Sequence, residues 1–337
     1  MCDCISTFFG SHSKTPELQC SYQTHSAPLA SFTSLVLLND ADGYPPPVPS
    51  RPVILENNLP GVRLTSETGF TSEIYNHGAH VGSWRDGNGD AILFLSKHAQ
   101  FTPPKAIRGG IPICFPQFSN LGPCATQHGF ARNQAWELVE QDSSQHKSRE
   151  CVFQLASSDA TKELWPHEFV ARFRVALVGD TMETSLSVTN SGDAKTFEFT
   201  AALHTYFAVG DIAKASVAGL GNTPYLDSLD GRIEKVDANE SVTFPHEVDR
   251  IYQQTPDCLQ VVDEANNRTI QIKKTNLPDA VVWNPWVDKC KATSDLGDSD
   301  YEKFLCVEAA AIQNPVKLAP GETWVCSQVL RVSKGCV

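Results

Sequence analysis

Short runs in which apolar residues alternate with polar ones, or predominate, recur along the chain from Gly61 onward, with turn-forming residues between them. Such runs are typical of β-strands with at least one buried face. The clearest alternation covers residues 181–189, and Asp86-Gly87-Asn88-Gly89 is a strong hairpin signal. The predicted strands are 62–68, 70–75, 79–84, 91–95, 135–139, 151–156, 169–178, 181–189, 195–207, 241–244, 258–263, 269–274, 280–283, 304–309 and 323–332.

Helical periodicity is scarce, and one short helix is predicted over residues 158–164, before Pro166. Strands this numerous, with so few helices, indicate an all-β fold of antiparallel sheets, either a large sandwich or a barrel. Residues 51–337 show no internal repeat and no further change in composition, so we interpret them as one domain. Residues 1–50 are rich in Ser and Thr and end in a Pro-rich run, which predicts a low-complexity extension and a semi-rigid linker.

The composition is typical of a soluble globular protein, because 41% of the residues are hydrophobic and 20% are charged. The formal net charge of -12 argues against a nucleic-acid partner and against an anionic membrane surface. No apolar run is long enough to span a membrane. A small anionic substrate is still compatible with this charge, since a few convergent arginines can create a local positive site. We expect a monomer that binds a small molecule.

The 11 cysteines include no C-x-x-C pair and no Cys/His spacing suited to zinc. We interpret them as buried, reduced thiols in a reducing compartment, and we expect neither a metal nor another cofactor. The expected location is the cytoplasm. A plastid is the alternative if residues 1–50 act as a transit peptide, although Asp3, Glu17 and the absence of arginine before Arg51 argue against it.

Residues 107–133 form an apolar stretch with neither helical nor strand periodicity. They contain Arg108, His128 and Arg132, which are costly to bury without partners and therefore suggest a ligand site. The alternative is a structural loop whose arginines pair with carboxylates elsewhere in the chain.

Two further polar residues stand in apolar runs. His204 follows residues 197–202, where a histidine can serve as acid or base near neutral pH, although a core histidine with a backbone partner is the more common case. Glu308 has small apolar neighbours, which favours a paired or pKa-shifted carboxyl over one at a strand edge facing water. The segment Trp283-Asn284-Pro285-Trp286 offers aromatic faces that stack on sugar rings, or that simply pack in the core.

Together these motifs resemble the aldose 1-epimerase superfamily, and within it the glucose-6-phosphate 1-epimerase branch, most closely its plant members. The resemblance covers roughly residues 52–332 in unbroken order. The segments 108–112 and 128–133 are specific to this family when they occur together. The matching segments are Arg108-Gly109-Gly110-Ile111-Pro112, Phe115-Pro116-Gln117-Phe118, His128-Gly129-Phe130-Ala131-Arg132-Asn133, Leu203-His204-Thr205-Tyr206-Phe207, Trp283-Asn284-Pro285-Trp286 and Val307-Glu308.

The resemblance implies a β-supersandwich, made of two large antiparallel sheets, that interconverts the α and β anomers of a hexose 6-phosphate. It implies that His204 is the catalytic acid and Glu308 the catalytic base. The residues that match substrate-binding positions of the family are Arg85, Gln100, Arg108, His128 and Asp249. Arg132 and Lys105 are further candidates for the phosphate site, or structural ion-pair partners.

The chemistry needs one base to take the proton of the C1 hydroxyl and one acid to protonate the ring oxygen. A carboxylate beside His204 would hold its charged form, and Asp249 is one candidate for that role. Two other functions remain open at this point. One is an epimerase of unphosphorylated aldoses, and the other is a carbohydrate-binding β-sandwich without catalytic activity.

Overall fold

A computed structural model of the protein describes residues 52–55, 57–141 and 149–335. The extension and linker predicted for residues 1–50 lie outside these ranges. Most of the described chain is β-strand, and every pairing between two of its strands is antiparallel. No helix among the described residues is long and apolar enough to cross a membrane.

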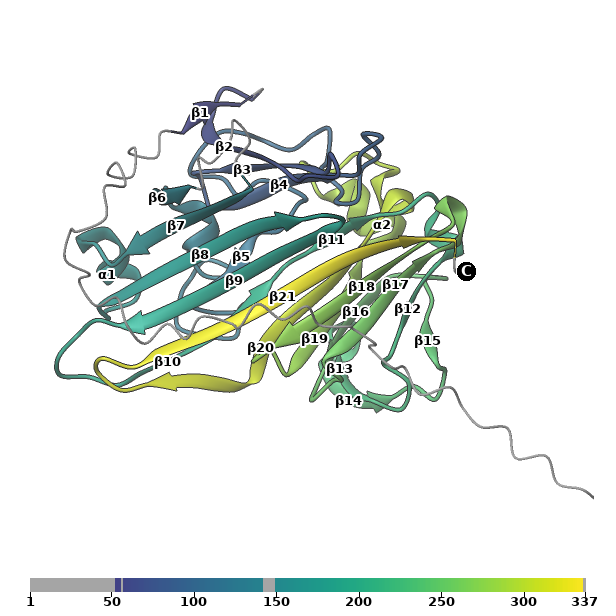
Figure 1. The fold of residues 1–337 in the computed structure, drawn as a ribbon. Helices are drawn as coiled ribbons and strands as arrows, with labels where there is room; N and C mark the ends of the chain where they lie inside the picture. The colour runs from purple at the N-terminus through teal and green to yellow at the C-terminus, as the bar shows by residue number, and fades with distance from the viewer. Residues whose placement is uncertain (1–51, 56, 142–148, 336–337) are drawn as a thin grey trace, which may run out of the picture. The chain divides into compact units, whose positions relative to one another are not determined.

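The strands form three sheets (Figure 1). The four-stranded sheet has the order β1 (Val53–Ile54), β2 (Pro60–Thr65), β3 (Thr71–Tyr75) and β4 (His80–Arg85). The eight-stranded sheet has the order β14 (Ile233–Val236), β13 (Pro224–Asp227), β16 (Val248–Tyr252), β19 (Asp279–Asn284), β20 (Phe304–Leu318), β10 (Phe197–Leu203) and β5 (Ile113–Cys114), with β11 (Tyr206–Ala208) also paired to β20. The nine-stranded sheet has the order β15 (Ser241–Val242), β12 (Ala215–Ala218), β17 (Cys258–Asp263), β18 (Arg268–Thr275), β21 (Thr323–Lys334), β9 (Thr181–Asn190), β8 (Phe169–Val178), β7 (Glu150–Ala156) and β6 (Glu137–Gln141).

One large hydrophobic core joins all three sheets. Its buried side chains include Ile74 of β3, Phe199 of β10, Val307 of β20, Leu186 of β9 and Leu330 of β21. Strand β9 buries every second residue, as its alternating sequence predicts, and contributes Met182, Leu186 and Val188 to this core. Strands β8, β9 and β21 run side by side through the nine-stranded sheet (Figure 1). Burying large apolar side chains in this way is the main source of stability for the fold.

Two helices complete the described fold, α1 (Asp159–Leu164) and α2 (Trp286–Ala292). Helix α1 begins where the sequence predicts it, because Ser158 and Thr161 form a reciprocal capping box. Helix α2 has no such signal, since no side chain caps it and its first residue, Trp286, has a φ of 56°.

Two predicted strands are not continuous in the structure. Residues 91–95 do not form a continuous strand, because Ala91, Leu93 and Leu95 each make an isolated bridge to a different segment of the chain. The predicted strand 195–207 is divided into β10 and β11, which pair with β20 on either side of His204 and Thr205. This interruption positions the candidate active site.

Candidate active site

The interruption between β10 and β11 brings His204 and Glu308 together. Leu203 pairs with Ala309 of β20, and Tyr206 pairs with Cys306, so His204 and Thr205 lie opposite Val307 and Glu308. Both side chains are buried, with relative exposures of 6% for His204 and 1% for Glu308. His204 Nδ1 lies 3.4 Å from Glu308 Oε1, within ion-pair distance.

A cavity of about 570 Å³ opens onto this pair. Neighbouring strands of the eight-stranded sheet form its floor, since Glu308 pairs with Val281 of β19, and Val281 pairs with Ile251 of β16. Asp249 of β16 lines the same cavity. The charged and ring-bearing residues that line it are Arg108, Phe118, His128, Arg132, His204, Arg232, Asp249, Trp283, Lys289 and Glu308.

Burial shifts the pKa values of His204 and Glu308 in opposite directions. It lowers the pKa of His204 well below its ordinary value, and the nearby His128, Arg132 and Arg108 add to that effect. It raises the pKa of Glu308 well above its ordinary value, with a further contribution from Asp249 and an opposing one from Arg132. Among the described residues, neither His204 Nδ1 nor Glu308 Oε2 has a hydrogen-bond partner. Both atoms are buried, and His204 Nδ1 is the imidazole nitrogen that faces Glu308 Oε1.

Aromatic rings hold His204 in place. The ring of Tyr206 stacks on the imidazole with centroids 4.7 Å apart and an interplanar angle of 8°, and Trp283 meets it edge-on. Burial raises the pKa of the Tyr206 hydroxyl, which stays neutral and accepts a hydrogen bond of 3.0 Å from Arg108 Nη1. Arg108 Nε also donates to Asp295 Oδ1 at 3.0 Å, so Arg108 is anchored on two sides.

His128 is held as a neutral hydrogen-bond donor. Its Nδ1 accepts from the backbone N–H of Ser119 at 3.1 Å and lies 3.2 Å from Cys114 Sγ. Burial lowers the pKa of His128 to about 2 and raises the pKa of the Cys114 thiol, so the ring is uncharged while the thiol keeps its proton. The imidazole proton is thereby placed on Nε2. His128 can donate to a ligand, but it is a poor candidate for the acid.

A smaller cavity of about 350 Å³ adjoins the first, since Arg108 and Arg132 line both. Gln100 and Lys105 also line this adjoining cavity, and Lys105 Nζ donates to Gln100 Oε1 at 2.7 Å. Arg132 Nη2 donates to Gln127 O at 3.0 Å, whereas its buried Nε has no partner among the described residues. Cationic donors therefore gather at one end of the site.

The chain matches the aldose 1-epimerase family over residues 60–331. It belongs to that family. A provisionally named glucose-6-phosphate 1-epimerase from Cenchrus ciliaris is 41% identical over 275 residues, which cover 80% of this chain and 83% of that protein. A protein from Escherichia coli K12 with the same provisional name is 40% identical over 266 residues, covering 76% and 85%. The crystal structure of a provisionally named mutarotase from Salmonella typhimurium matches with a TM-score of 0.74 and 32% identity, covering 82% of this chain and 91% of that one.

These comparisons and the sheets confirm the family and the all-β antiparallel fold that the sequence predicts. Five of the seven residues that the resemblance selects line the cavity: Arg108, His128, His204, Asp249 and Glu308. Gln100 lies in the adjoining cavity of this epimerase. Asp249 pairs with Lys289 at 3.6 Å, and the carboxylate beside His204 is that of Glu308 rather than that of Asp249.

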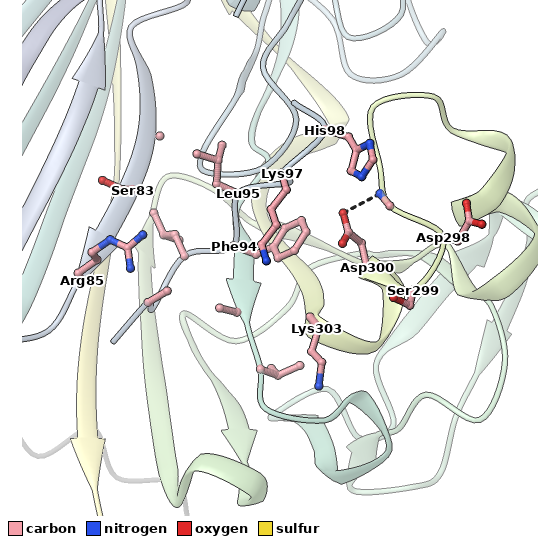
Figure 2. Close-up of a pocket in the computed structure, with 16 residues that line it drawn as sticks. Ser83, Arg85, Phe94, Leu95, Lys97, His98, Asp298, Ser299, Asp300 and Lys303 are labelled. Carbon is pink, nitrogen blue, oxygen red and sulfur yellow. Dashed lines mark hydrogen bonds between the residues drawn. The ribbon is translucent and has the colours of Figure 1, made fainter. Parts of the chain in front are cut away.

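Arg85 is not part of this assembly. It lies at the end of β4, is exposed, and donates from Nη1 to Gly89 O at 3.1 Å. It lines a different cavity, which shares no residue with the cavity of His204 and Glu308 (Figure 2). The expected pairing of Arg85 with Arg108 around one phosphate group is therefore not seen in the structure.

The structure adds two cations that the sequence does not single out, Arg232 and Lys289. Arg232 follows the turn after β13 and donates to Asn120 Oδ1 at 2.9 Å, on the segment that carries His128. Lys289 lies on α2 and pairs with Glu247 at 2.9 Å. Neither residue stands in an apolar run, which is the signal that reveals His204 and Glu308.

Proposed function

We propose that this epimerase interconverts the α and β anomers of glucose 6-phosphate or of a closely similar hexose 6-phosphate. The observation that carries the proposal is the buried pair of His204 and Glu308, 3.4 Å apart, in a cavity that Arg108 and Arg132 line. The relatives at about 40% identity carry the name of that activity, which supports the choice of a phosphorylated substrate.

The reaction opens and closes the sugar ring. The Glu308 carboxylate takes the proton from the C1 hydroxyl while the His204 imidazolium gives a proton to the ring oxygen, and the bond between C1 and that oxygen breaks. The open-chain aldehyde rotates about C1–C2. Glu308 then returns its proton to the aldehyde oxygen and His204 takes one from the C5 hydroxyl, so that the ring closes on the other face.

Burial brings the proton affinities of His204 and Glu308 closer together, which favours this exchange of protons. In water, a proton shared between the two groups would favour histidine, whose ordinary pKa of 6.5 exceeds the carboxyl value of 4.5. The opposite shifts of the two pKa values bring the neutral arrangement closer in free energy to the ion pair. Because ring opening converts the ion pair into the neutral pair, similar proton affinities lower the cost of forming the open-chain sugar.

The cations give the substrate an orientation. We place the phosphate toward Arg108 and Arg132, where Gln100 and Lys105 offer further polar contacts. A guanidinium fork donates two parallel hydrogen bonds to phosphate oxygens, and Arg132 has an unused buried Nε–H. The sugar ring then lies between the Nε2–H of His128 and the carboxylate of Asp249, which bind its hydroxyl groups.

The activity is tested by supplying pure α-glucose 6-phosphate and following the β anomer with a dehydrogenase that consumes only that form. We expect conversion well above the spontaneous rate, and a loss of about 10²–10⁴-fold in His204→Asn and in Glu308→Gln. The exposed substitutions His246→Asn and Glu163→Gln serve as matched controls and should keep full activity. A wild-type protein that adds nothing to the spontaneous rate would refute the proposal.

Substrate choice is tested by comparing glucose 6-phosphate with glucose in Arg132→Gln. Loss of one guanidinium should lower kcat/KM for the phosphosugar by about 10²-fold and leave glucose nearly unaffected. Arg172→Gln, which changes an exposed arginine of β8, is the control. If the wild-type protein converts glucose at least as efficiently as glucose 6-phosphate, the enzyme is an epimerase of unphosphorylated aldoses instead.

A further inference from the structure

The cavity that contains Arg85 is as large as the candidate active site. Its volume is about 600 Å³, against about 570 Å³ for the cavity of His204 and Glu308. Its walls come from the end of β4, from residues 91–98, from the end of β11 and from residues 297–303 (Figure 2). Such a volume is typical of sites that bind small molecules.

Three cations line this second cavity without a counter-charge bound to them. Arg85 donates to Gly89 O at 3.1 Å and Lys303 Nζ donates to Gly210 O at 2.8 Å, so both bind backbone carbonyls rather than carboxylates. Lys97 makes no side-chain hydrogen bond or ion pair with any residue in the described ranges. All three therefore keep free donors in a chain whose net charge is -12.

The two carboxylates of the cavity do not neutralise these cations. Asp300 Oδ2 accepts from Ser96 Oγ at 2.9 Å and from the backbone N–H of Gly297 at 2.8 Å, which ties it to the loop that it supports. Asp298 is exposed, and Figure 2 places it across the cavity from Arg85. Neither carboxylate forms an ion pair with Arg85, Lys97 or Lys303 within the described chain.

We propose that the cavity of Arg85, Lys97 and Lys303 is a second binding site, separate from the candidate active site, for a small molecule that carries a phosphate group. A phosphate offers several acceptor oxygens and about two negative charges, which matches a cavity lined by three cations with unused donors. Leu93, Leu95 and Val209 supply an apolar wall for the remainder of the molecule. The proposal does not depend on which sugar the active site converts.

The site is tested by measuring how fast each lysine amine of the full chain is acetylated, residue by residue, by mass spectrometry. Inorganic phosphate is the probe, and chloride at equal ionic strength is the reference. We expect phosphate to slow the acetylation of Lys97 by about fivefold, because a bound anion holds the ammonium group. The exposed Lys195 and Lys214, which lie outside both cavities, should react at unchanged rates.

Substitution separates this site from the active site. In Arg85→Gln the protection of Lys97 by phosphate should be lost, whereas Arg172→Gln should retain it; Lys303→Gln gives an independent second variant. The proposal is overturned if phosphate leaves Lys97 unprotected, if Arg85→Gln and Lys303→Gln both keep full protection, or if all lysines respond alike. Because anomer conversion is not measured, failure here is distinct from failure of the proposed activity.

Discussion

Burial acts on His204 and Glu308 in opposite directions and makes the neutral form of each more favourable. The pair then carries one labile proton over a wide pH range, on either the carboxyl or the imidazole. Since the side chains lie 3.4 Å apart and interact strongly, their titration belongs to the pair rather than to one residue. This has consequences for both activity and stability.

In the proposed mechanism, activity needs the pair to hold one labile proton. Below the lowered pKa of His204 both groups are protonated and the base is lost, whereas above the raised pKa of Glu308 both are deprotonated and the acid is lost. We therefore expect kcat/KM to stay level across the neutral range and to fall only outside it. The profile is measured with the anomer assay in buffers from about pH 5 to about pH 9. A fall centred near the ordinary histidine pKa of 6.5 would contradict this expectation.

Glu308 should make stability depend on pH with the opposite sign from an ordinary paired carboxylate. A raised pKa in the folded state means that folded protein holds the proton more tightly than unfolded chain, so stability falls as pH rises from the ordinary value of 4.5 toward the raised one. Glu308→Gln cannot ionise and avoids this loss. Urea unfolding should therefore favour the variant over wild type increasingly between about pH 5 and about pH 8. A constant or reversed difference would show that ionised Glu308 is stabilised in the fold.

Among the elements, β20 has the largest influence on the site, because it carries Glu308 and pairs with β10, β11 and β19. Its course beyond Glu308 depends on Asp279, a fully buried residue of β19. Asp279 accepts backbone hydrogen bonds from Ile312 and Gln313 of β20, at 2.7 and 2.9 Å, and from Gln254 at 3.2 Å. One carboxylate thus fixes the register of β20 close to Glu308.

Asp279→Ala should therefore lower both stability and activity. Three backbone N–H groups, of which that of Ile312 is buried, lose their charged acceptor, which should reduce the free energy of unfolding by about 3 kcal/mol. Urea unfolding measures this loss, and the anomer assay should show lower kcat because Glu308 is displaced. Asp211→Ala, which removes a single contact to the backbone N–H of Ala213, is the control and should cost less than about 1 kcal/mol. Equal losses in the two variants would argue against this role.

The regular elements are predictable from sequence where burial follows a simple period. The bounds of β8 and β17 agree with the predicted strands, and β9 differs by one residue, because one face of each strand packs in the core. Strands β13 and β14 have few buried residues and no clear alternation, so their sequences carry little signal. Helix α2 is short, has no side-chain cap and begins at a residue in the left-handed conformation, so its sequence does not predict it either.

The residues of the candidate site also differ in how clearly the sequence reveals them. His204 and Glu308 are recognisable because a titratable side chain in an apolar strand needs a reason to be there. Arg85 could not be placed from sequence, because its position depends on how β4 is oriented against residues 91–98, which is a tertiary relationship. Arg232 is equally hidden, since it reaches the cavity from a hairpin at the edge of the sheet.

For the whole molecule, charge is distributed unevenly. The net charge is -12, yet Arg108, Arg132, Arg232 and Lys289 line one cavity. A local positive site within an acidic protein attracts anions only at short range, and dissolved salt weakens that attraction further.

Substrate binding should accordingly depend on ionic strength. Raising salt from about 20 mM to about 200 mM should increase KM for glucose 6-phosphate several-fold, because screening weakens the attraction between the phosphate and the cations. KM for uncharged glucose, measured under the same conditions, should change little. If KM for the phosphosugar does not respond to salt, then these cations do not take part in binding it.

The interruption between β10 and β11 also affects how this protein can change over time. His204 lies between two strands that both pair with β20, which carries Glu308, so backbone hydrogen bonds on both sides of the interruption set the distance between the two side chains. The cations Arg132, Arg232 and Lys289 lie instead on a short helical turn, a hairpin and a helix. The proposed proton-transfer pair and these three cations therefore lie on separate parts of the scaffold. Exchange of those peripheral segments offers a route to new sugar specificities that leaves the proton-transfer machinery intact.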